Sequence, residues 1–178
     1  MELTDALFDL CKNLPQPIIA IDGPAGAGKT TLASHLAAAL SLRYRCTVLH
    51  MDSLYNGWDS PFDEHFTSAL QKVVASHRRG EATSFPRYDW RHHHFGAAEE
   101  VPAAELLILE GVGSMDGVIR SDLTVTIWID IDPEQGFSRV INRDGDQISE
   151  EMQRWLQLQA QHFLANDSKN TADFILTN

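Results

Sequence analysis

Glycine, lysine and threonine occur near the start of the chain at a spacing that can hold phosphate. The stretch from Gly23 to Thr30 reads G-x-x-x-x-G-K-T, and the apolar run 18–21 leads directly into it. Glycines allow successive backbone N–H groups to converge on phosphate oxygens at the positive end of a following helix. The motif therefore predicts a loop that binds the phosphates of a nucleoside triphosphate, which we expect to be ATP. The residues expected to bind it are Gly23, Ala25, Gly26, Ala27, Gly28, Lys29, Thr30 and Thr31.

Two side chains of this stretch carry distinct chemistry. We expect Lys29 to reach the β- and γ-phosphates as a point charge, and the Thr30 hydroxyl to ligate Mg²⁺. The alternative is a glycine-rich strand-to-helix turn that binds nothing. The order of apolar run, glycine-rich loop and helix-forming segment favours the phosphate loop, because such a loop requires that context.

A carboxylate follows the next apolar segment. Asp52 comes directly after residues 46–51, which read as a buried strand. Ligands of open parallel sheets bind at the carboxyl ends of the strands. A carboxylate there could take the proton of an attacking hydroxyl group, as a general base. The alternative role for Asp52 is to cap a helix. Asp22, directly before the loop, could support the site or be purely structural.

Arg139 and Arg143 are four residues apart, a spacing that places both side chains on one face of a helix. Two guanidinium groups there could clamp triphosphate oxygens and neutralise charge on the transferring group, which would make both residues catalytic. The alternative is a solvated helix face on which Asp144 pairs with an arginine.

Three consecutive histidines, 92–94, invite a metal-binding interpretation. Adjacent residues of a strand point to opposite faces, and no cysteine or carboxylate stands at a recognisable zinc spacing from them. We therefore predict no metal site there.

The elements that must position these residues alternate between strand and helix. The predicted strands are 18–21, 46–51, 105–110, 123–130 and 172–177. The predicted helices are 2–13, 31–42, 62–77, one opened by Pro133, and 149–165, with an irregular section from Gly80 through Pro86 to His94. This order predicts an α/β P-loop NTPase fold, a five-stranded parallel sheet with helices on both faces. We expect one domain, 1–178, with an N-terminal helix at 1–14, an acceptor-binding region at 53–100 and a lid at 136–150.

The first helix carries an apolar stripe, because Leu3, Leu7, Leu10 and Leu14 recur at helical spacing. A parallel sheet must be covered on both faces. We expect this stripe to pack beside the last strand.

Composition narrows the classes of partner. The 178 residues include 14 basic and 25 acidic ones, a net charge of −11, which argues against a general nucleic-acid-binding protein. No apolar run approaches the length of a membrane span, the first residues lack the features of a signal peptide, and the two cysteines form no disulfide framework. We therefore expect a cytoplasmic protein that binds neither nucleic acid nor membrane.

Five short strings beyond the phosphate loop carry a family resemblance. They read L-H-M-D-S-L-Y at 49–55, W-D-S-P-F-D at 58–63, P-R-Y-D at 86–89 with His93 beyond it, L-E-G at 109–111 and R-V-I-N-R-D at 139–144. In this order they resemble the uridine kinases, a branch of the P-loop nucleoside and nucleotide kinases. The chain departs from that family at 145–148, where G-D-Q-I replaces a stretch that carries further arginines.

The resemblance implies roles for further residues. Glu110 would hold Mg²⁺ directly or through water. Asp59 would bind sugar hydroxyls, whereas Tyr88 and His93 would meet a base. Apart from the resemblance, Asp52 followed by Tyr55 and Asp59 has the character of an acceptor pocket, so we expect Tyr55 to belong to it. The implied function is an ATP- and Mg²⁺-dependent kinase that phosphorylates a hydroxyl of a small molecule, most directly a nucleoside.

Two other functions stay open. A nucleoside-monophosphate kinase would need cations for the acceptor phosphate, a role available to Arg78, Arg79, Arg87 or Arg91. A nucleotide-dependent switch or binding module would have no phosphoryl acceptor, and the N-K-x-D motif that reads guanine is absent. Carboxylates at Asp52, Asp59 and Asp63 favour an uncharged acceptor over a monophosphate, because they would repel its phosphate.

Overall fold

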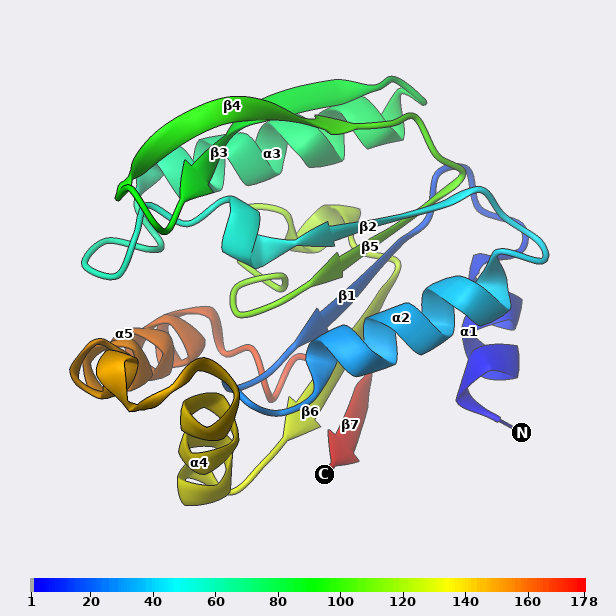
Figure 1. Ribbon diagram of the computed structural model, residues 1–178. Helices are drawn as coiled ribbons and strands as arrows, with labels where there is room; N and C mark the ends of the chain where they lie inside the picture. The colour runs from blue at the N-terminus through cyan, green and yellow to red at the C-terminus, as the bar shows by residue number, and fades with distance from the viewer. Residues whose placement is uncertain (1) are drawn as a thin grey trace.

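A five-stranded parallel sheet forms the centre of the computed structural model, which describes residues 2–178 (Figure 1). From edge to edge the strands are β2 (Cys46–His50), β5 (Leu106–Glu110), β1 (Ile18–Asp22), β6 (Val125–Asp130) and β7 (Phe174–Thr177). Each neighbouring pair runs parallel. The predicted sheet is confirmed, and the loop after β1 emerges at the middle of its carboxyl edge.

Helices cover both faces of this sheet. They are α1 (Leu3–Cys11), α2 (Lys29–Leu40), α3 (Glu64–Arg78), α4 (Pro133–Asp144) and α5 (Ser149–Asn166), with short 3₁₀ turns η1 (Met51–Ser53), η2 (Arg120–Asp122) and η3 (Asp146–Ile148). α1 and α2 lie on one face and α3 lies on the other (Figure 1). Across residues 2–178, no helix has both the length and the apolar character needed to cross a membrane.

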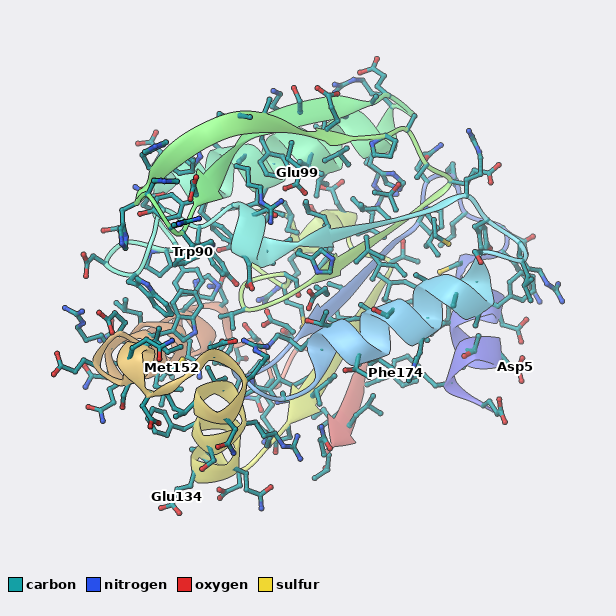
Figure 2. The ribbon with its side chains drawn as sticks, in the orientation of Figure 1. Asp5, Trp90, Glu99, Glu134, Met152 and Phe174 are labelled. Atoms are coloured by element: carbon teal, nitrogen blue, oxygen red, sulfur yellow. The ribbon has the colours of Figure 1, made fainter. Side chains whose placement is uncertain are left out.

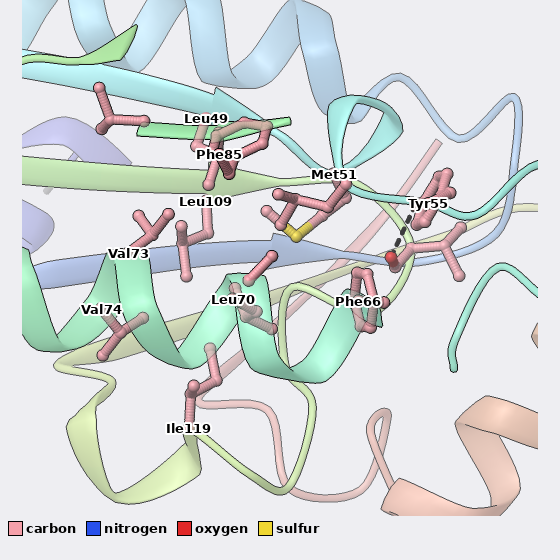
Figure 3. Close-up of a cluster of buried hydrophobic side chains, with 14 of the residues drawn as sticks. Leu49, Met51, Tyr55, Phe66, Leu70, Val73, Val74, Phe85, Leu109 and Ile119 are labelled. Atoms are coloured by element: carbon pink, nitrogen blue, oxygen red, sulfur yellow. Dashed lines mark hydrogen bonds between the residues drawn. The ribbon is translucent and has the colours of Figure 1, made fainter. Parts of the chain in front are cut away.

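Strand residues alternate between two cores. Ile18 joins the core that contains α3, whereas Ile19 and Ile21 join the core that contains α1 and α2. Figure 3 shows the first of these cores, with Leu70 of α3 facing Leu109 of β5. Because both faces are buried, β1 and β5 read as continuous apolar runs in the sequence.

A β-hairpin occupies most of the section that the sequence predicts to be irregular, and that prediction is wrong. β3 (Thr83–Asp89) pairs antiparallel with β4 (His94–Val101), and the hairpin lies over α3 (Figure 1). The register shifts between Pro86 and Tyr88, so the buried side chains of β3, Phe85 and Tyr88, are not two residues apart. This bulge hides the alternation by which a strand is recognised in sequence.

α1 packs against the core through a different set of side chains from the predicted one. Leu7 and Cys11 are buried, in a cluster that also reaches α2 and β7. The predicted stripe is wrong at Leu10 and Leu14, which remain 48% and 49% exposed. The helix ends at Cys11, so Leu14 lies beyond it and helical spacing no longer applies.

Candidate active site

The phosphate loop, residues 23–28, joins β1 to α2. Gly23 and Gly26 have φ angles of +137° and +79°. A Cβ atom at either position would lie 2.3 Å from a backbone oxygen, that of Ile129 in β6 or that of Gly136 in α4. Only glycine permits such a close approach, so the loop is seated tightly against β6 and α4.

Lys29 begins α2 and is nearly buried, with 8% of its surface exposed. Its Nζ donates hydrogen bonds to the carbonyl oxygens of Gly23 and Pro24, at 2.7 and 2.8 Å. Burial lowers the pKa of Lys29, and the charges of Asp22 and Glu110 oppose that shift. The ammonium group therefore lies on the loop that it is predicted to serve.

Asp22 braces the same loop from inside the molecule. Its fully buried carboxylate accepts hydrogen bonds from the backbone N–H groups of Gly23 at 2.7 Å, Gly113 at 3.2 Å and Met115 at 3.1 Å. Burial raises the pKa of Asp22 to about 6 despite these hydrogen bonds. The carboxyl group ties the end of β1 to the segment that follows β5.

Thr30 and Glu110 converge beside the loop. The Thr30 hydroxyl lies 3.1 and 3.2 Å from the two carboxylate oxygens of Glu110, which is 4% exposed. The His50 Nδ1 atom also contacts Glu110 Oε1. Sequence reasoning missed His50, although its place in β2, directly opposite Glu110 in β5, could have indicated the pair.

This donor set fits a magnesium ion. Mg²⁺ takes oxygen ligands and is commonly held by one or two carboxylates together with substrate phosphates. A hydroxyl and a carboxylate side by side, next to a loop suited to phosphates, supply that combination.

Asp52 lies on η1, just beyond the carboxyl end of β2. Its side chain faces the cavity described below, and the surrounding protein raises its pKa by desolvation, with a further contribution from the charge of Glu110. The backbone carbonyl of Asp52 accepts a hydrogen bond from Trp90 Nε1 at 3.2 Å. The next long helix, α3, is capped by Asp63, which accepts from Phe66 N; Asp52 does not cap it.

One cavity of about 680 Å³ brings most of the predicted site residues together. Those that line it are Ala25, Gly26, Gly28, Lys29, Thr30, Thr31, Asp52, Tyr55, His93, Glu110, Arg139 and Arg143. Gly23 and Ala27 lie in the loop outside this lining. Asp59 and Tyr88 line an adjoining cavity of about 420 Å³, which shares Trp58, His93 and Glu151 with the first.

Three tryptophans that sequence reasoning missed form much of the wall opposite the loop. The ring centroids of Trp58 and Trp90 are 5.1 Å apart, and those of Trp58 and Trp155 are 5.9 Å apart. Trp90, in the hairpin turn, and Met152, on α5, both line this cavity, and both are labelled in Figure 2. Tyr55 is 1% exposed and donates its hydroxyl to Val112 O at 2.7 Å, so it contributes only ring surface.

Arg139 and Arg143 enter the cavity from α4, on one helical face as predicted. Arg139 Nη1 donates to Gly26 O at 3.4 Å, which places its guanidinium group on the phosphate loop. Arg143 makes two hydrogen bonds of 2.7 Å to the carboxylate of Asp144, the partner that the sequence left open.

The adjoining cavity has a mixed charge. The Asp59 side chain is 88% exposed and lies 4.0 Å from Arg154 Nη1, and Arg154 Nη2 lies 4.0 Å from Glu151. His93 has a φ angle of +55° in the tight turn of the hairpin. Arg154 was not predicted as a site residue. Its spacing of three residues from Glu151 on a helix does not by itself indicate a binding site.

The arginines considered for an acceptor phosphate are engaged elsewhere. Arg78 donates to the backbone of residues 15 and 16, Arg79 pairs with Glu81, and Arg87 pairs with Glu99. Within the described chain, residues 2–178, these three and Arg91 lie outside the lining of both cavities.

A family model described as AAA domain matches residues 19–156. Among curated proteins, the uridine kinase of Schizosaccharomyces pombe is 30% identical over 143 residues, which cover 71% of this chain and 31% of that protein. Uridine kinase-like protein 4 of Arabidopsis thaliana is 28% identical over 161 residues, covering 80% of this chain and 33% of that protein. The chain therefore spans about a third of the length of each of these two relatives.

Two solved structures share this fold. A protein of Silicibacter sp. TM1040, provisionally assigned as a fructose transport system kinase, superposes with a TM-score of 0.71 at 19% identity, covering 98% of each chain. A possible uridine kinase of Bacillus stearothermophilus has a TM-score of 0.61 at 20% identity, covering 99% of this chain and 100% of that chain. At these identities the likeness concerns the fold.

Proposed function

The chain belongs to the AAA domain family of P-loop proteins, and we propose that it is an ATP- and Mg²⁺-dependent kinase that phosphorylates a hydroxyl group of a small molecule, most directly a nucleoside. One observation carries the proposal. A single cavity is lined by the phosphate loop, by the Thr30–Glu110 pair and by the Asp52 carboxylate. These are the parts that phosphoryl transfer to a hydroxyl requires.

The phosphate end of the cavity would bind the triphosphate. The backbone N–H groups of residues 26–30 and the Lys29 ammonium group would neutralise its oxygens. Thr30 and Glu110 would hold Mg²⁺, which when bound neutralises charge on the β- and γ-phosphate oxygens. Arg139 and Arg143 would stabilise the charge that spreads over the transferring phosphoryl group.

Asp52 would act as the general base. The acceptor hydroxyl oxygen forms a bond to the γ-phosphorus while the bond from that phosphorus to the β–γ bridging oxygen breaks, which releases ADP. The hydroxyl proton passes to the Asp52 carboxylate. Desolvation and the charge of Glu110 raise the pKa of Asp52, and a carboxylate with a raised pKa is a stronger base.

An uncharged acceptor with a planar ring suits the rest of the lining. Trp58, Trp90 and Trp155 offer aromatic surface for stacking, and the acceptor would reach the adjoining cavity, where Asp59, Tyr88 and His93 could meet its polar groups. The names of the uridine kinase relatives support a nucleoside as that acceptor.

The two alternatives have less support. A doubly charged acceptor phosphate is costly to desolvate without fixed cations, and the candidates Arg78, Arg79, Arg87 and Arg91 lie outside the lining of both cavities. Arg154, which lines the adjoining cavity, is flanked by Asp59 and Glu151. A nucleotide-dependent switch has no phosphoryl acceptor, so it would not need an aromatic surface beyond Asp52.

An ADP-release assay at moderate salt tests the proposal. The panel comprises nucleosides, nucleoside monophosphates, and small sugar or vitamin alcohols. We expect uncharged hydroxyl compounds, nucleosides above all, to stimulate ADP release. Stimulation by monophosphates alone would favour the monophosphate kinase, and turnover that no acceptor changes would favour the switch.

A further inference from the structure

We propose that Gln159 of α5 is a positioning residue that holds the phosphate loop in its binding conformation. The proposal rests on the proposed function, because it assumes that the loop binds a nucleoside triphosphate. Gln159 lies outside the fixed positions of the loop motif and outside the lining of both cavities.

The contact joins two distant parts of the chain. Gln159 Oε1 accepts a hydrogen bond from the backbone N–H of Ala25 at 3.1 Å, across 134 residues of sequence. Gln159 is 5% exposed, so its amide is held in a fixed place by the surrounding protein. The other glutamines of α5, Gln153, Gln157 and Gln161, are exposed. The buried glutamine of this helix is therefore the one that reaches the loop.

The phosphate loop is proposed to bind its ligand through backbone N–H groups, so contacts that fix its backbone affect binding. The side of the loop that faces α4 is fixed by the close approach of Gly26 to Gly136 and by the hydrogen bond from Arg139 to Gly26 O. Gln159 fixes the adjoining residue, Ala25, from α5. A loop already curled before the ligand arrives loses less conformational freedom on binding. Gln159 would thus raise affinity for the triphosphate without touching it.

The same face of α5 also contributes to the aromatic surface that is proposed to bind the acceptor. Trp155 is four residues before Gln159, so both side chains lie on one face of α5, and Trp155 lines the main cavity. α5 therefore supports the phosphate loop and the acceptor wall from one rigid element. This arrangement gives the helix a role in the site that the family motifs do not mark.

Two measurements on Gln159→Met test the proposal, with Gln157→Met as the matched control on the exposed face of α5. Methionine keeps the length and unbranched shape of glutamine and removes the strong acceptor oxygen. The first measurement is amide hydrogen exchange by NMR in the nucleotide-free protein. The second is the Kd of the non-hydrolysable analogue AMP-PNP with Mg²⁺, by calorimetry. Should Gln159→Met fail to fold, Gln159→Leu replaces it.

We expect the Ala25 amide of Gln159→Met to exchange several-fold faster than in wild type, and AMP-PNP to bind about three- to tenfold more weakly, the usual effect of one lost hydrogen bond. Gln157→Met should match wild type in both. Faster exchange with unchanged affinity would overturn the positioning role and leave a merely structural contact. Unchanged exchange would overturn the contact itself. A wild-type protein that fails to bind AMP-PNP would overturn the proposed function, a result distinct from these.

Discussion

The Thr30 hydroxyl lies 3.1 Å from Glu110 Oε1, although 80 residues separate them in the chain. Thr30 is in the first turn of α2 and Glu110 ends β5, so the pair forms only because β1 and β5 are neighbours in the parallel sheet. The sheet order thus brings a hydroxyl and a carboxylate to one side of the phosphate loop.

This pair predicts a specific effect on the magnesium requirement. Glu110→Gln removes the charge that would hold Mg²⁺ but keeps the shape of the side chain. We expect the Mg²⁺ concentration for half-maximal ADP release to rise at least tenfold, because a neutral amide is a much weaker magnesium ligand. Glu105→Gln, at an exposed residue directly before β5, is the control. An unchanged magnesium titration in Glu110→Gln would rule out this ligand.

Lys29→Ala should lower kcat by two to three decades, because a charge-assisted contact to the transferring group is lost. Circular dichroism should show the fold retained. Lys72→Ala, an exposed lysine on α3, should leave the rate unchanged. Near wild-type turnover in Lys29→Ala would mean that the loop does not bind the triphosphate as proposed.

Asp22 predicts a pH dependence of stability. Its folded pKa is raised from 3.8 to about 6, so the folded state holds this proton more tightly than the unfolded state. The resulting stabilisation is fully present below about pH 4 and is lost as pH rises through about 6. Two units of pKa correspond to on the order of 3 kcal/mol.

Urea unfolding of wild type and Asp22→Asn between pH 4.5 and 7.5 measures this contribution. The variant cannot titrate at residue 22, so subtracting its free energy of unfolding isolates the Asp22 carboxyl group. We expect the difference, wild type minus variant, to fall as the pH rises. A difference that is constant or rises with pH would show that the raised pKa is wrong.

α1 offers a test of packing with a built-in control. Leu7 is fully buried and Leu10 is 48% exposed, three residues away on the same helix. Leu7→Ala should lower the free energy of unfolding by about 2–5 kcal/mol, and Leu10→Ala by less than about 1 kcal/mol. Equal losses in the two variants would contradict the packing of α1 through Leu7 and Cys11.

The sequence was sufficient for the parts of the molecule that local pattern determines. The G-x-x-x-x-G-K-T motif needs a strand before it and a helix after it, and buried strands such as β5 read as apolar runs, so the sheet and the loop could be predicted. Asp52 could be placed at the site because ligands of parallel sheets bind at the carboxyl ends of the strands, whereas Glu110 is placed there by the resemblance to uridine kinases.

Other features depend on contacts between distant segments. The bulge between Pro86 and Tyr88 breaks the period of the hairpin, and Phe85 of β3 is buried in the core that contains α3. His50 becomes a partner of Glu110 only through the register of β2 with β5, and Gln159 looks like any other glutamine of α5 until the fold brings it to Ala25. No local pattern marks such residues.

The transfer of the γ-phosphoryl group to an acceptor hydroxyl is most directly tested by following that group. ATP labelled at the γ-phosphate is incubated with the acceptor that gives the greatest ADP release, and the label is located by mass spectrometry in wild type, Asp52→Asn and the control Asp63→Asn. Wild type should place the label in a phosphate monoester of the acceptor, one per ADP. Asp52→Asn should lower this rate by two to four decades, with AMP-PNP affinity within a few-fold of wild type. Label that appears only as inorganic phosphate, or transfer by Asp52→Asn at nearly the wild-type rate, would contradict the proposed kinase and its base.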